Sequence, residues 1–329
     1  MYEVSEITDR TGWDGLVNQM SGHPLQLWGW GALKGAHNWQ AHRLVVTREG
    51  VQVATAQVLS RRLPFPFKSV SHIPRGPSFA TADLAERSAI TTVLARFVKD
   101  NYGGVGITIE TDLDASAAIT VPGAIASPNP ILYPKTLILD LTQGADSLMS
   151  ACSRTTRSDI RKGIRNGLEI RRAVTDEDVA AVIATYRQNA DRQGFALHSD
   201  QYYWDLHRLL GEDSIITACF DEGEAVAFTW TARSNTTYFE LYGGSTDRGR
   251  KLRANAPVKW FCISEALAQG ATRFDLNGLL NDGISEFKKS FSEHETELQP
   301  SFDLKFNALY GVWNSLLPAA KKVLRKIRK

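Results

Sequence analysis

The chain has 329 residues, 43% of them hydrophobic and 22% charged, and its 38 lysines and arginines almost balance 36 aspartates and glutamates. Because domains usually hold roughly 100–200 residues, this length predicts two of them. The composition excludes a disordered chain, a collagen and a coiled-coil rod. The net charge of +2 favours no class of partner, so partners must be inferred from local patterns.

The cysteines and the N-terminal residues indicate a cytoplasmic protein. Cys152, Cys219 and Cys262 are far apart and form no Cys-x-x-Cys pair, which favours buried thiols in a reducing compartment over disulfides or a zinc site. The first ten residues are acidic and lack the apolar run of a signal peptide. Residues 115–134 carry no charge but contain four prolines, so we expect a linker there and not a membrane helix.

In the first half, the pattern predicts two helices, then a hairpin, then a strand–helix–strand unit. The hairpin is indicated by β-rich runs on both sides of Arg48-Glu49-Gly50. An apolar face that repeats at helical spacing predicts the last and longest helix. The expected helices cover residues 13–20, 28–36 and about 82–99, and the expected strands lie within 42–62 and at 69–73 and 106–110.

The second half repeats this order of hairpin, strand, helix and strand. Its helices are expected at residues 146–166, 176–193, 201–210 and 254–269, its hairpin at 215–234 around Asp221-Glu222-Gly223, and its later strands at 237–242 and 273–276. The repeat predicts an α/β (α+β) protein of two similar domains, with mixed sheets flanked by helices. We place the first domain at 1–134, the second at 135–300, and a C-terminal segment with a basic helix at 301–329.

The last 20 residues predict a helix that is strongly basic and has some apolar surface. Its six cations are offset by no acid: Lys321, Lys322, Arg325, Lys326, Arg328 and Lys329. Two interpretations stay open. The helix lies on an anionic membrane leaflet, or it docks on the body of the protein and leaves its end in water.

Several common chemistries have no sequence support. The chain contains no phosphate-binding P-loop motif and no G-x-S-x-G nucleophile motif. The glycines at 103, 104 and 106 come before a predicted strand, the wrong side for a dinucleotide loop. The seven histidines are scattered and suggest no metal site. We therefore expect neither a metal nor a cofactor.

Two clusters of cations remain as candidate contacts for an anion. Arg154, Arg157, Arg161 and Arg165 fall on one face of a predicted helix, where they meet nucleic-acid phosphates or simply form a solvated face. The second cluster comes just before the helix expected at 254, where an anion would satisfy both the cations and the helix N-terminus. It consists of Arg248, Arg250, Lys251 and Arg253.

The order of elements, with basic residues before a helix, resembles the GNAT-like N-acyltransferase fold. Acetyl-CoA enzymes of that fold carry small residues in the corresponding turn, which lets backbone amides reach a pyrophosphate. Here Lys251 and Arg253 stand at those positions. We therefore expect acyl-CoA to be a poor donor and a different activated acyl group to be used.

Five stretches, in the right order, resemble motifs of the FemAB/FemX peptidoglycan-bridge aminoacyltransferases. They are Q-x-x-x-W-G-x-x-K at 26–34, I-P-R-G-P at 73–77, T-R-x-x-I-R-K at 156–162 with Gly167, Y-G-G-S at 242–245, and D-x-x-G at 275–278 with F-K-x-x-F at 287–291. The resemblance implies two GNAT-like domains and transfer of an amino acid from aminoacyl-tRNA to the stem-peptide amine of lipid II or UDP-MurNAc-pentapeptide. It also implies work in the cytoplasm, with peripheral contact at the inner membrane leaflet. The chain lacks the long helical hairpin of some members and is similar to the short FemX type.

The resemblance assigns roles to individual residues. Lys288, beside Phe287, would stabilise the oxyanion, an effect of about 3–4 kcal/mol for a fixed donor. Lys34 would hold the acceptor diphosphate, and the arginine face would contact tRNA. Other substrate contacts are implied for Trp30, Arg75, Arg192, His198, Tyr202 and Tyr242. The family's R-x-x-x-Y pair is replaced here by His198 and Tyr202, and Arg192 is expected to compensate for the lost cation.

Two other function classes stay open at this point. One is a CoA-dependent N-acyltransferase of GNAT type, disfavoured by the bulky residues in the turn. The other is a non-enzymatic protein that binds anionic lipid or RNA through the arginine face and the basic tail. No residue is assigned as the general base.

Overall fold

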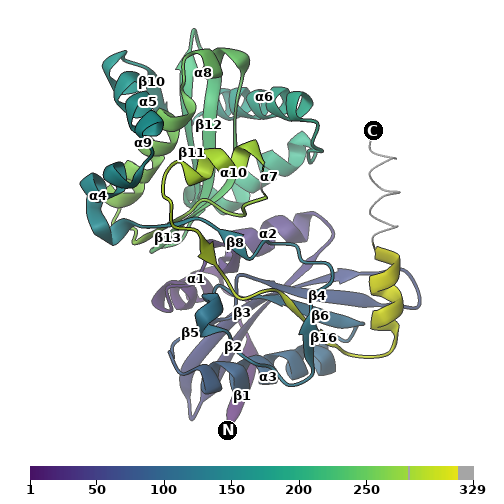
Figure 1. Ribbon diagram of the computed structural model, residues 1–329. Coiled ribbons are helices and arrows are strands. Elements are labelled where there is room, and N and C mark those ends of the chain that lie inside the picture. The colour runs from purple at the N-terminus through teal and green to yellow at the C-terminus, as the bar shows by residue number, and fades with distance from the viewer. Residues whose placement is uncertain (281, 318–329) are drawn as a thin grey trace. The chain divides into compact units, whose positions relative to one another are not determined.

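A computed structural model describes residues 1–280 and 282–317, and in it the chain forms two compact units (Figure 1). Unit 1 comprises Met1–Pro134 together with the chain from Glu297 onward, and unit 2 comprises Lys135–Thr296. Within the described residues, no helix is long and apolar enough to cross a membrane. The helix expected at the C-terminus starts at residue 309, and its basic part lies outside the described residues.

Unit 1 is a mixed sheet with helices on both faces. The strand order is β1-β2-β3-β4-β6-β16-β7, with β5 beside β3, and β4 and β6 are its parallel pair. The strands are β1 (Tyr2–Glu6), β2 (Gln40–Arg48), β3 (Val51–Arg62), β4 (Ser69–Pro74), β5 (Ser78–Phe79), β6 (Gly106–Glu110), β7 (Ala124–Ala126) and β16 (Phe302–Lys305). The helices are α1 (Arg10–Gln19), α2 (Trp28–Ala36) and α3 (Leu84–Asn101).

Alternation along β2 explains why helices cover both faces of this sheet. Val45 packs with residues of α1 such as Trp13, while its neighbours Leu44 and Val46 pack on the other face with α3. Successive side chains of a strand point to opposite faces, so a continuous apolar strand needs cover on both sides. The β2–β3 turn has positive φ at both Glu49 and Gly50, the backbone of a tight hairpin turn.

Unit 2 has a second mixed sheet, ordered β10-β11-β12-β13-β14-β9, in which β13 and β14 are parallel. Its strands are β9 (Ile138–Asp140), β10 (Glu169–Arg172), β11 (Ser214–Asp221), β12 (Glu224–Arg233), β13 (Thr237–Ser245) and β14 (Arg273–Asp275), while β8 (Lys135–Thr136) and β15 (Thr296–Glu297) pair separately. The helices are α4 (Gly144–Ala151), α5 (Arg154–Arg165), α6 (Asp176–Gln193), α7 (Asp200–Leu210), α8 (Asp247–Lys251), α9 (Asn255–Ala268) and α10 (Gly283–Lys289).

The two sheets share one plan, which confirms the expected tandem fold. In each, the last strand of an antiparallel run is followed by a helix and then by a strand parallel to it. These units are β4-α3-β6 in unit 1 and β13-α9-β14 in unit 2. In each, a strand from a distant part of the sequence pairs antiparallel with the second parallel strand, β16 with β6 in unit 1 and β9 with β14 in unit 2. Each unit therefore has a GNAT-like sheet flanked by helices.

Two expectations about local structure are wrong. The single helix expected over 146–166 is broken after Ala151, because Ser153 caps a new helix by accepting a hydrogen bond from the Thr156 amide (3.2 Å). Residues 302–305 do not belong to a separate C-terminal segment, since β16 joins the sheet of unit 1 between β6 and β7. All three cysteines are buried and unpaired, as expected.

Candidate active site

The parallel strands of unit 2 separate halfway along, and this opening is where the candidate site lies. β13 and β14 pair only from Thr237 and Arg273 to Phe239 and Asp275, whereas β13 continues to Ser245. An extra residue, Leu241, interrupts the register with β12 and bends the strand as β-bulges do. In unit 1 the equivalent strands stay paired to their ends, at Pro74 and Glu110.

Asn277, which lies two residues after the end of β14, connects the two strands across this opening through its side chain. Its Nδ2 donates to the Glu240 carbonyl oxygen of β13 (3.0 Å), and its own amide donates to Asp275 Oδ1 (2.7 Å). The residue has a φ of 63°, the left-handed conformation that asparagine tolerates better than most residues. The chain turns there, so that the carbonyl groups of Asn277 and Gly278 become available as acceptors for a cation.

Lys288 is that cation. Its Nζ donates to the carbonyl oxygens of Asn277 (3.3 Å) and Gly278 (2.9 Å). Helix α10 positions it, and the N-cap of this helix is Asp282, whose carboxylate accepts a hydrogen bond from the Ser285 amide (2.8 Å). An ammonium group has three N–H donors. Two donate to backbone carbonyls, so among the residues that the structure describes one N–H remains for an oxygen of a ligand.

A buried ion pair accompanies Lys288 in unit 2. Lys259 on α9 donates to the carboxylate of Glu240 on β13, and both side chains are buried. Burial lowers the pKa of Lys288, and the positive charge of Lys259 lowers it further, while the negative charge of Glu240 opposes both. Sequence reasoning missed this pair, because neither residue stands in a motif.

Phe287 anchors α10 rather than facing outward. Its ring packs against the hydrophobic core of unit 2 and meets Phe291 edge-on, with 5.5 Å between the ring centroids. The Lys259 ammonium lies 5.7 Å from the Phe287 ring centroid. This packing fixes the helix that carries Lys288, and the expected catalytic role of Phe287 stays a prediction.

Three of the expected acceptor contacts come together in an aromatic cluster of unit 2. Tyr202 and Tyr242 share a side-chain hydrogen bond, and the exposed His198 ring stacks on Tyr202 with 4.0 Å between the ring centroids. Burial raises the pKa of both tyrosines, so their phenols stay neutral at physiological pH. Sequence reasoning missed the other members of the cluster: Tyr186, Tyr203, Phe228 and Trp230.

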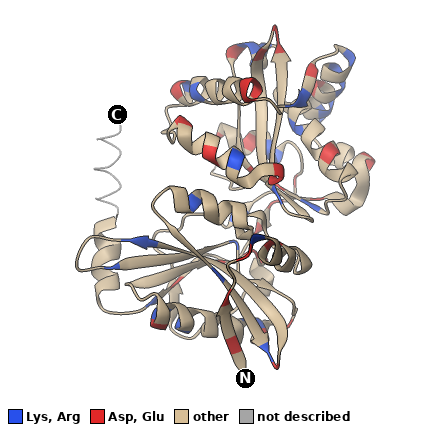
Figure 2. Ribbon diagram, turned by 180° about the vertical axis from the view of Figure 1, so that it is seen from behind, with Lys and Arg blue, Asp and Glu red and all other residues tan. Residues whose placement is uncertain are grey.

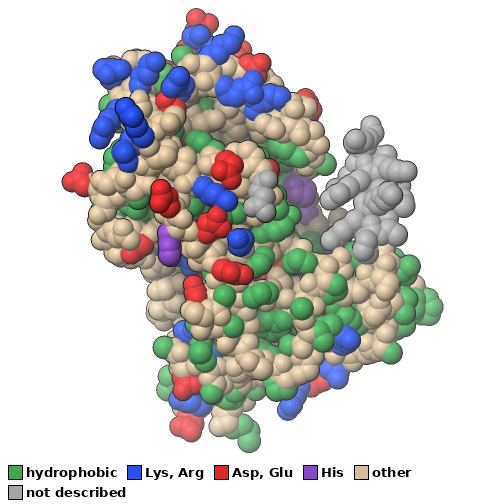
Figure 3. Space-filling model, in the orientation of Figure 1, with side chains coloured by type: hydrophobic (Ala, Val, Ile, Leu, Met, Phe, Trp, Pro, Cys, Tyr) green, Lys and Arg blue, Asp and Glu red, His purple; other side chains and the backbone are tan. Residues whose placement is uncertain are grey.

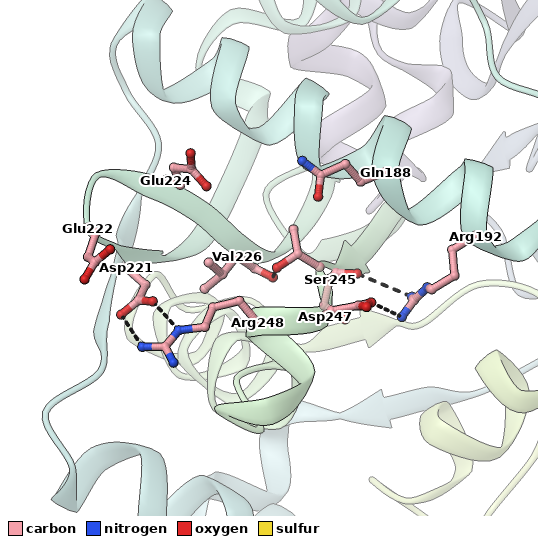
Figure 4. A pocket seen from close by; sticks show the side chains of 10 residues that line it. Gln188, Arg192, Asp221, Glu222, Glu224, Val226, Ser245, Asp247 and Arg248 are labelled. Carbon is pink, nitrogen blue, oxygen red and sulfur yellow. Dashed lines mark hydrogen bonds and ion pairs between the residues drawn. The ribbon is translucent and has the colours of Figure 1, made fainter.

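Arg192 faces a different hollow, of about 670 Å³ (Figure 4). It donates to Asn189 Oδ1 (2.6 Å) and to the Ser245 carbonyl oxygen (3.3 Å). The structure gives no contact between Arg192 and His198 or Tyr202, all three of which are described. Its expected compensation for the missing family arginine therefore stays a prediction without geometric support.

The cations expected to attract an anion before α9 are largely neutralised. Three of the four arginines and lysines of this cluster pair with aspartates: Arg248 with Asp221, Arg250 with Asp247 and Arg253 with Asp159. The hollow beside them is lined by two cations, one of them Arg248, and by four carboxylates, Asp221, Glu222, Glu224 and Asp247. The aspartates provide the compensation that we expected from a bound anion.

The arginine face of α5 is smaller than the spacing predicts. Arg157 donates to the carbonyl oxygens of Ser150 and Cys152, so it holds the turn between α4 and α5. Arg154, Arg161 and Arg165 are exposed, and the structure shows no acidic partner for them among the residues it describes. Figure 3 shows Lys and Arg side chains gathered over this helix.

In unit 1, Lys34 and Trp30 lie together on α2. The Lys34 ammonium lies 4.4 Å from the Trp30 ring centroid, a cation–π contact one helical turn apart. Burial lowers the pKa of Lys34 to about 8. The helix start is fixed by Asp14 of α1, whose carboxylate accepts from the Trp28 amide (2.7 Å).

Arg75 is held by the linker of its own unit. It donates to the Tyr133 carbonyl oxygen (2.9 Å), and the whole residue is only 2% exposed. It occupies the I-P-R-G-P turn, where Gly76 packs so closely on Gln26 that a Cβ atom would come within 2.6 Å of it. The observed contact is structural, and the expected substrate contact of Arg75 stays a prediction.

The fold and the open strand pair define the class of this protein: it carries a tandem GNAT-like fold, the architecture of N-acyltransferases. Residues 150–289 match the family described as acetyltransferase (GNAT) domain. The fold of the crystal structure of FemX matches with a TM-score of 0.82 and 19% sequence identity, over 95% of this chain and 100% of that one. A tandem GNAT protein from the clavulanic acid biosynthesis pathway matches with a TM-score of 0.53 and 10% identity, over 93% and 99% of the two chains.

The resemblance to the FemAB/FemX family is confirmed by sequence along nearly the whole chain. The lipid II:glycine glycyltransferase of Staphylococcus aureus is 20% identical over 399 aligned residues, which cover 93% of this chain and 94% of that protein. A second S. aureus sequence of the same description is 22% identical over the same coverage. The similarity therefore includes both units and is not limited to the GNAT domain.

Proposed function

We propose that this protein transfers an amino acid to the stem-peptide amine of a peptidoglycan precursor, with aminoacyl-tRNA as the donor. The observation that carries the proposal is Lys288, held by two backbone carbonyls at the opening of the β13–β14 pair, with one N–H that has no partner in the described part of the chain. The donor ester is already activated, so the amine attacks its carbonyl directly. The negative charge that develops on the carbonyl oxygen then meets a preorganised ammonium group.

Each unit has its own candidate contacts for the acceptor. Lys34 and Trp30 of unit 1 are proposed to hold the diphosphate, Lys34 acting as a point charge. His198, Tyr202 and Tyr242 of unit 2 are proposed to line the acceptor groove, through phenols that burial keeps neutral. The curated relatives are lipid II:glycine glycyltransferases, which favours lipid II as the acceptor. The reaction is proposed to take place at the inner face of the membrane.

An acyl-CoA donor is disfavoured on electrostatic grounds. The hollow beside the turn before α9, where the GNAT resemblance places a pyrophosphate, is lined by four carboxylates and by only two arginines. Both arginines have an aspartate partner, Asp247 for Arg192 and Asp221 for Arg248. A pyrophosphate would therefore meet net negative charge there. The three exposed arginines of α5, which have no acidic partner within residues 1–280 and 282–317, are a better match for the phosphates of a tRNA.

The proposal is tested by a transfer assay with purified protein and mass spectrometry of the acceptor. The donors are charged tRNA or acetyl-CoA, and the acceptors are lipid II or UDP-MurNAc-pentapeptide. We expect the mass of one added amino acid, from charged tRNA alone, on lipid II in preference to the nucleotide-linked form. A product from acetyl-CoA alone would replace this proposal by the CoA-dependent reaction, and binding of tRNA or lipid without any product would replace it by a binding module.

The arginines of α5 are expected to set the salt dependence of tRNA binding. Replacing Arg154, Arg161 and Arg165 by Gln should reduce the slope of log K against log salt by roughly 2–3, because each lost phosphate contact removes about 0.7–0.9. The matched control replaces three exposed arginines that pair with acids, Arg10, Arg48 and Arg208, and makes the same change in net charge. Equal slopes for the two triple variants would remove α5 from the donor site.

A further inference from the structure

The loop between β3 and β4 of unit 1 displays a fully exposed aromatic residue. Phe65 is 97% exposed, and Pro64 and Pro66 on either side restrict its backbone. The loop is closed by hydrogen bonds from the Leu63 amide to the Lys68 carbonyl oxygen (2.8 Å) and from the Phe67 amide to the Pro64 carbonyl oxygen (3.0 Å). This geometry keeps the Phe65 ring in water.

The helix that starts at residue 309 packs beside this loop and adds to its apolar surface. The rings of Phe67 and Trp313 are in contact, with 5.5 Å between their centroids. Val312 and Leu316, one helical turn apart, are each about half exposed. Asn314 ties the helix to unit 1 through Asn129 (2.8 Å). Figure 1 shows this helix next to the end of the sheet, and Figure 3 shows hydrophobic side chains on that end.

Cations flank the exposed aromatic residue on both sides. Arg61 and Arg62 come before it and Lys68 after it, and all three line a hollow of about 780 Å³ that has no carboxylate among its described lining residues. The Arg61 guanidinium lies 5.7 Å from the Trp39 ring centroid in the same hollow. Figure 2, which shows the molecule from behind, has basic positions on the strands beside the helix.

We propose that the loop 61–68 and the helix that starts at residue 309 form a docking surface for an anionic phospholipid bilayer. Phe65 inserts among the acyl chains at the interface, while Arg61, Arg62 and Lys68 meet lipid phosphates. An exposed aromatic residue with cations on both sides in the sequence suits a soft anionic interface, whereas a protein partner would need a complementary pocket. This inference does not depend on the transfer reaction.

The test is co-sedimentation of the full-length protein with vesicles of phosphatidylcholine alone or mixed with phosphatidylglycerol. We expect binding to the anionic vesicles, weakened about tenfold or more by Phe65→Ser. Joint replacement of Arg61, Arg62 and Lys68 by Gln should weaken it by roughly fivefold per cation. The matched control is Val51→Ser, which changes another exposed hydrophobic residue at the opposite end of β3 and should bind as the unaltered protein does.

Three outcomes would overturn the proposal. Binding of Phe65→Ser equal to that of the unaltered protein would exclude insertion, and equal binding to neutral vesicles would exclude recognition of charge. If the triple Gln variant lost affinity for RNA but not for vesicles, the surface would be assigned to RNA instead. Because Phe65 is almost fully exposed, Phe65→Ser should keep an unchanged melting temperature, so a loss of binding is not explained by unfolding.

Discussion

Lys288→Met is expected to lower turnover by about 10²–10³ and to leave the fold intact. The change removes the one N–H that is free to stabilise an oxyanion, and loss of a single such donor costs about that factor. The affected constant should be kcat, with little change in KM, because the contact exists only when negative charge develops on the carbonyl oxygen. Steady-state kinetics with charged tRNA and lipid II measures both.

The neighbouring lysine provides the control. Lys289 lies on the same short helix but pairs at the surface with Glu286 and Glu295, and surface pairs contribute little. Lys289→Met should therefore keep full turnover. If Lys288→Met also kept full turnover, or if its loss followed a lowered melting temperature, Lys288 would be a clamp for the backbone of Asn277 and Gly278 and not a catalytic residue.

The pH dependence of turnover further separates a catalytic role of Lys288 from a role as a clamp for the backbone. Burial lowers the pKa of Lys288 below the ordinary value of lysine. The charged form is the one that stabilises an oxyanion, so turnover is complete below this pKa and falls as the pH rises through it. In Lys288→Arg, whose side chain stays charged, the residual turnover should show no such alkaline loss.

The repeated fold follows from local patterns that the sequence displays directly. Turns with an acidic residue before glycine at 49–50 and 222–223 locate both hairpins, and helical periodicity locates α3 and α6. The break between α4 and α5 was missed because Ser153 follows an unbroken helical pattern, although serine is itself a favourable helix cap. The strand β16 could not be predicted either, since its partners β6 and β7 lie almost two hundred residues earlier in the chain.

The candidate site was predictable only where a motif names its residues. Family motifs indicated Lys288, Tyr202 and Tyr242, and the structure describes their surroundings. Arg157 matched a motif too, but its hydrogen bonds to Ser150 and Cys152 became visible only with the turn before α5. No spacing rule connects Glu240 on a strand with Lys259 on the next helix, because only the packing of α9 on the sheet brings them together.

That buried pair carries the largest expected effect on stability. Lys259 is 4% exposed and Glu240 is 7% exposed, so removing one partner leaves an uncompensated charge in the interior. Glu240→Leu and Lys259→Met should each lower the free energy of unfolding by about 3–5 kcal/mol. The double variant should be markedly more stable than the sum of the two losses predicts, because replacing both charges by apolar groups is often nearly neutral. Urea unfolding of the four proteins gives the coupling free energy.

The double variant also shows why the pair matters to the reaction. Glu240 opposes the effect that burial and Lys259 have on the pKa of Lys288, whereas the apolar pair removes one charge of each sign near the ammonium group. A double variant that folds stably and keeps full turnover would limit the pair to structural support. A stable double variant with reduced turnover would mean that Glu240 helps to keep Lys288 charged. If the loss of stability in the double variant equalled the sum of the two single losses, Glu240 and Lys259 would not be directly coupled. That result would contradict both interpretations.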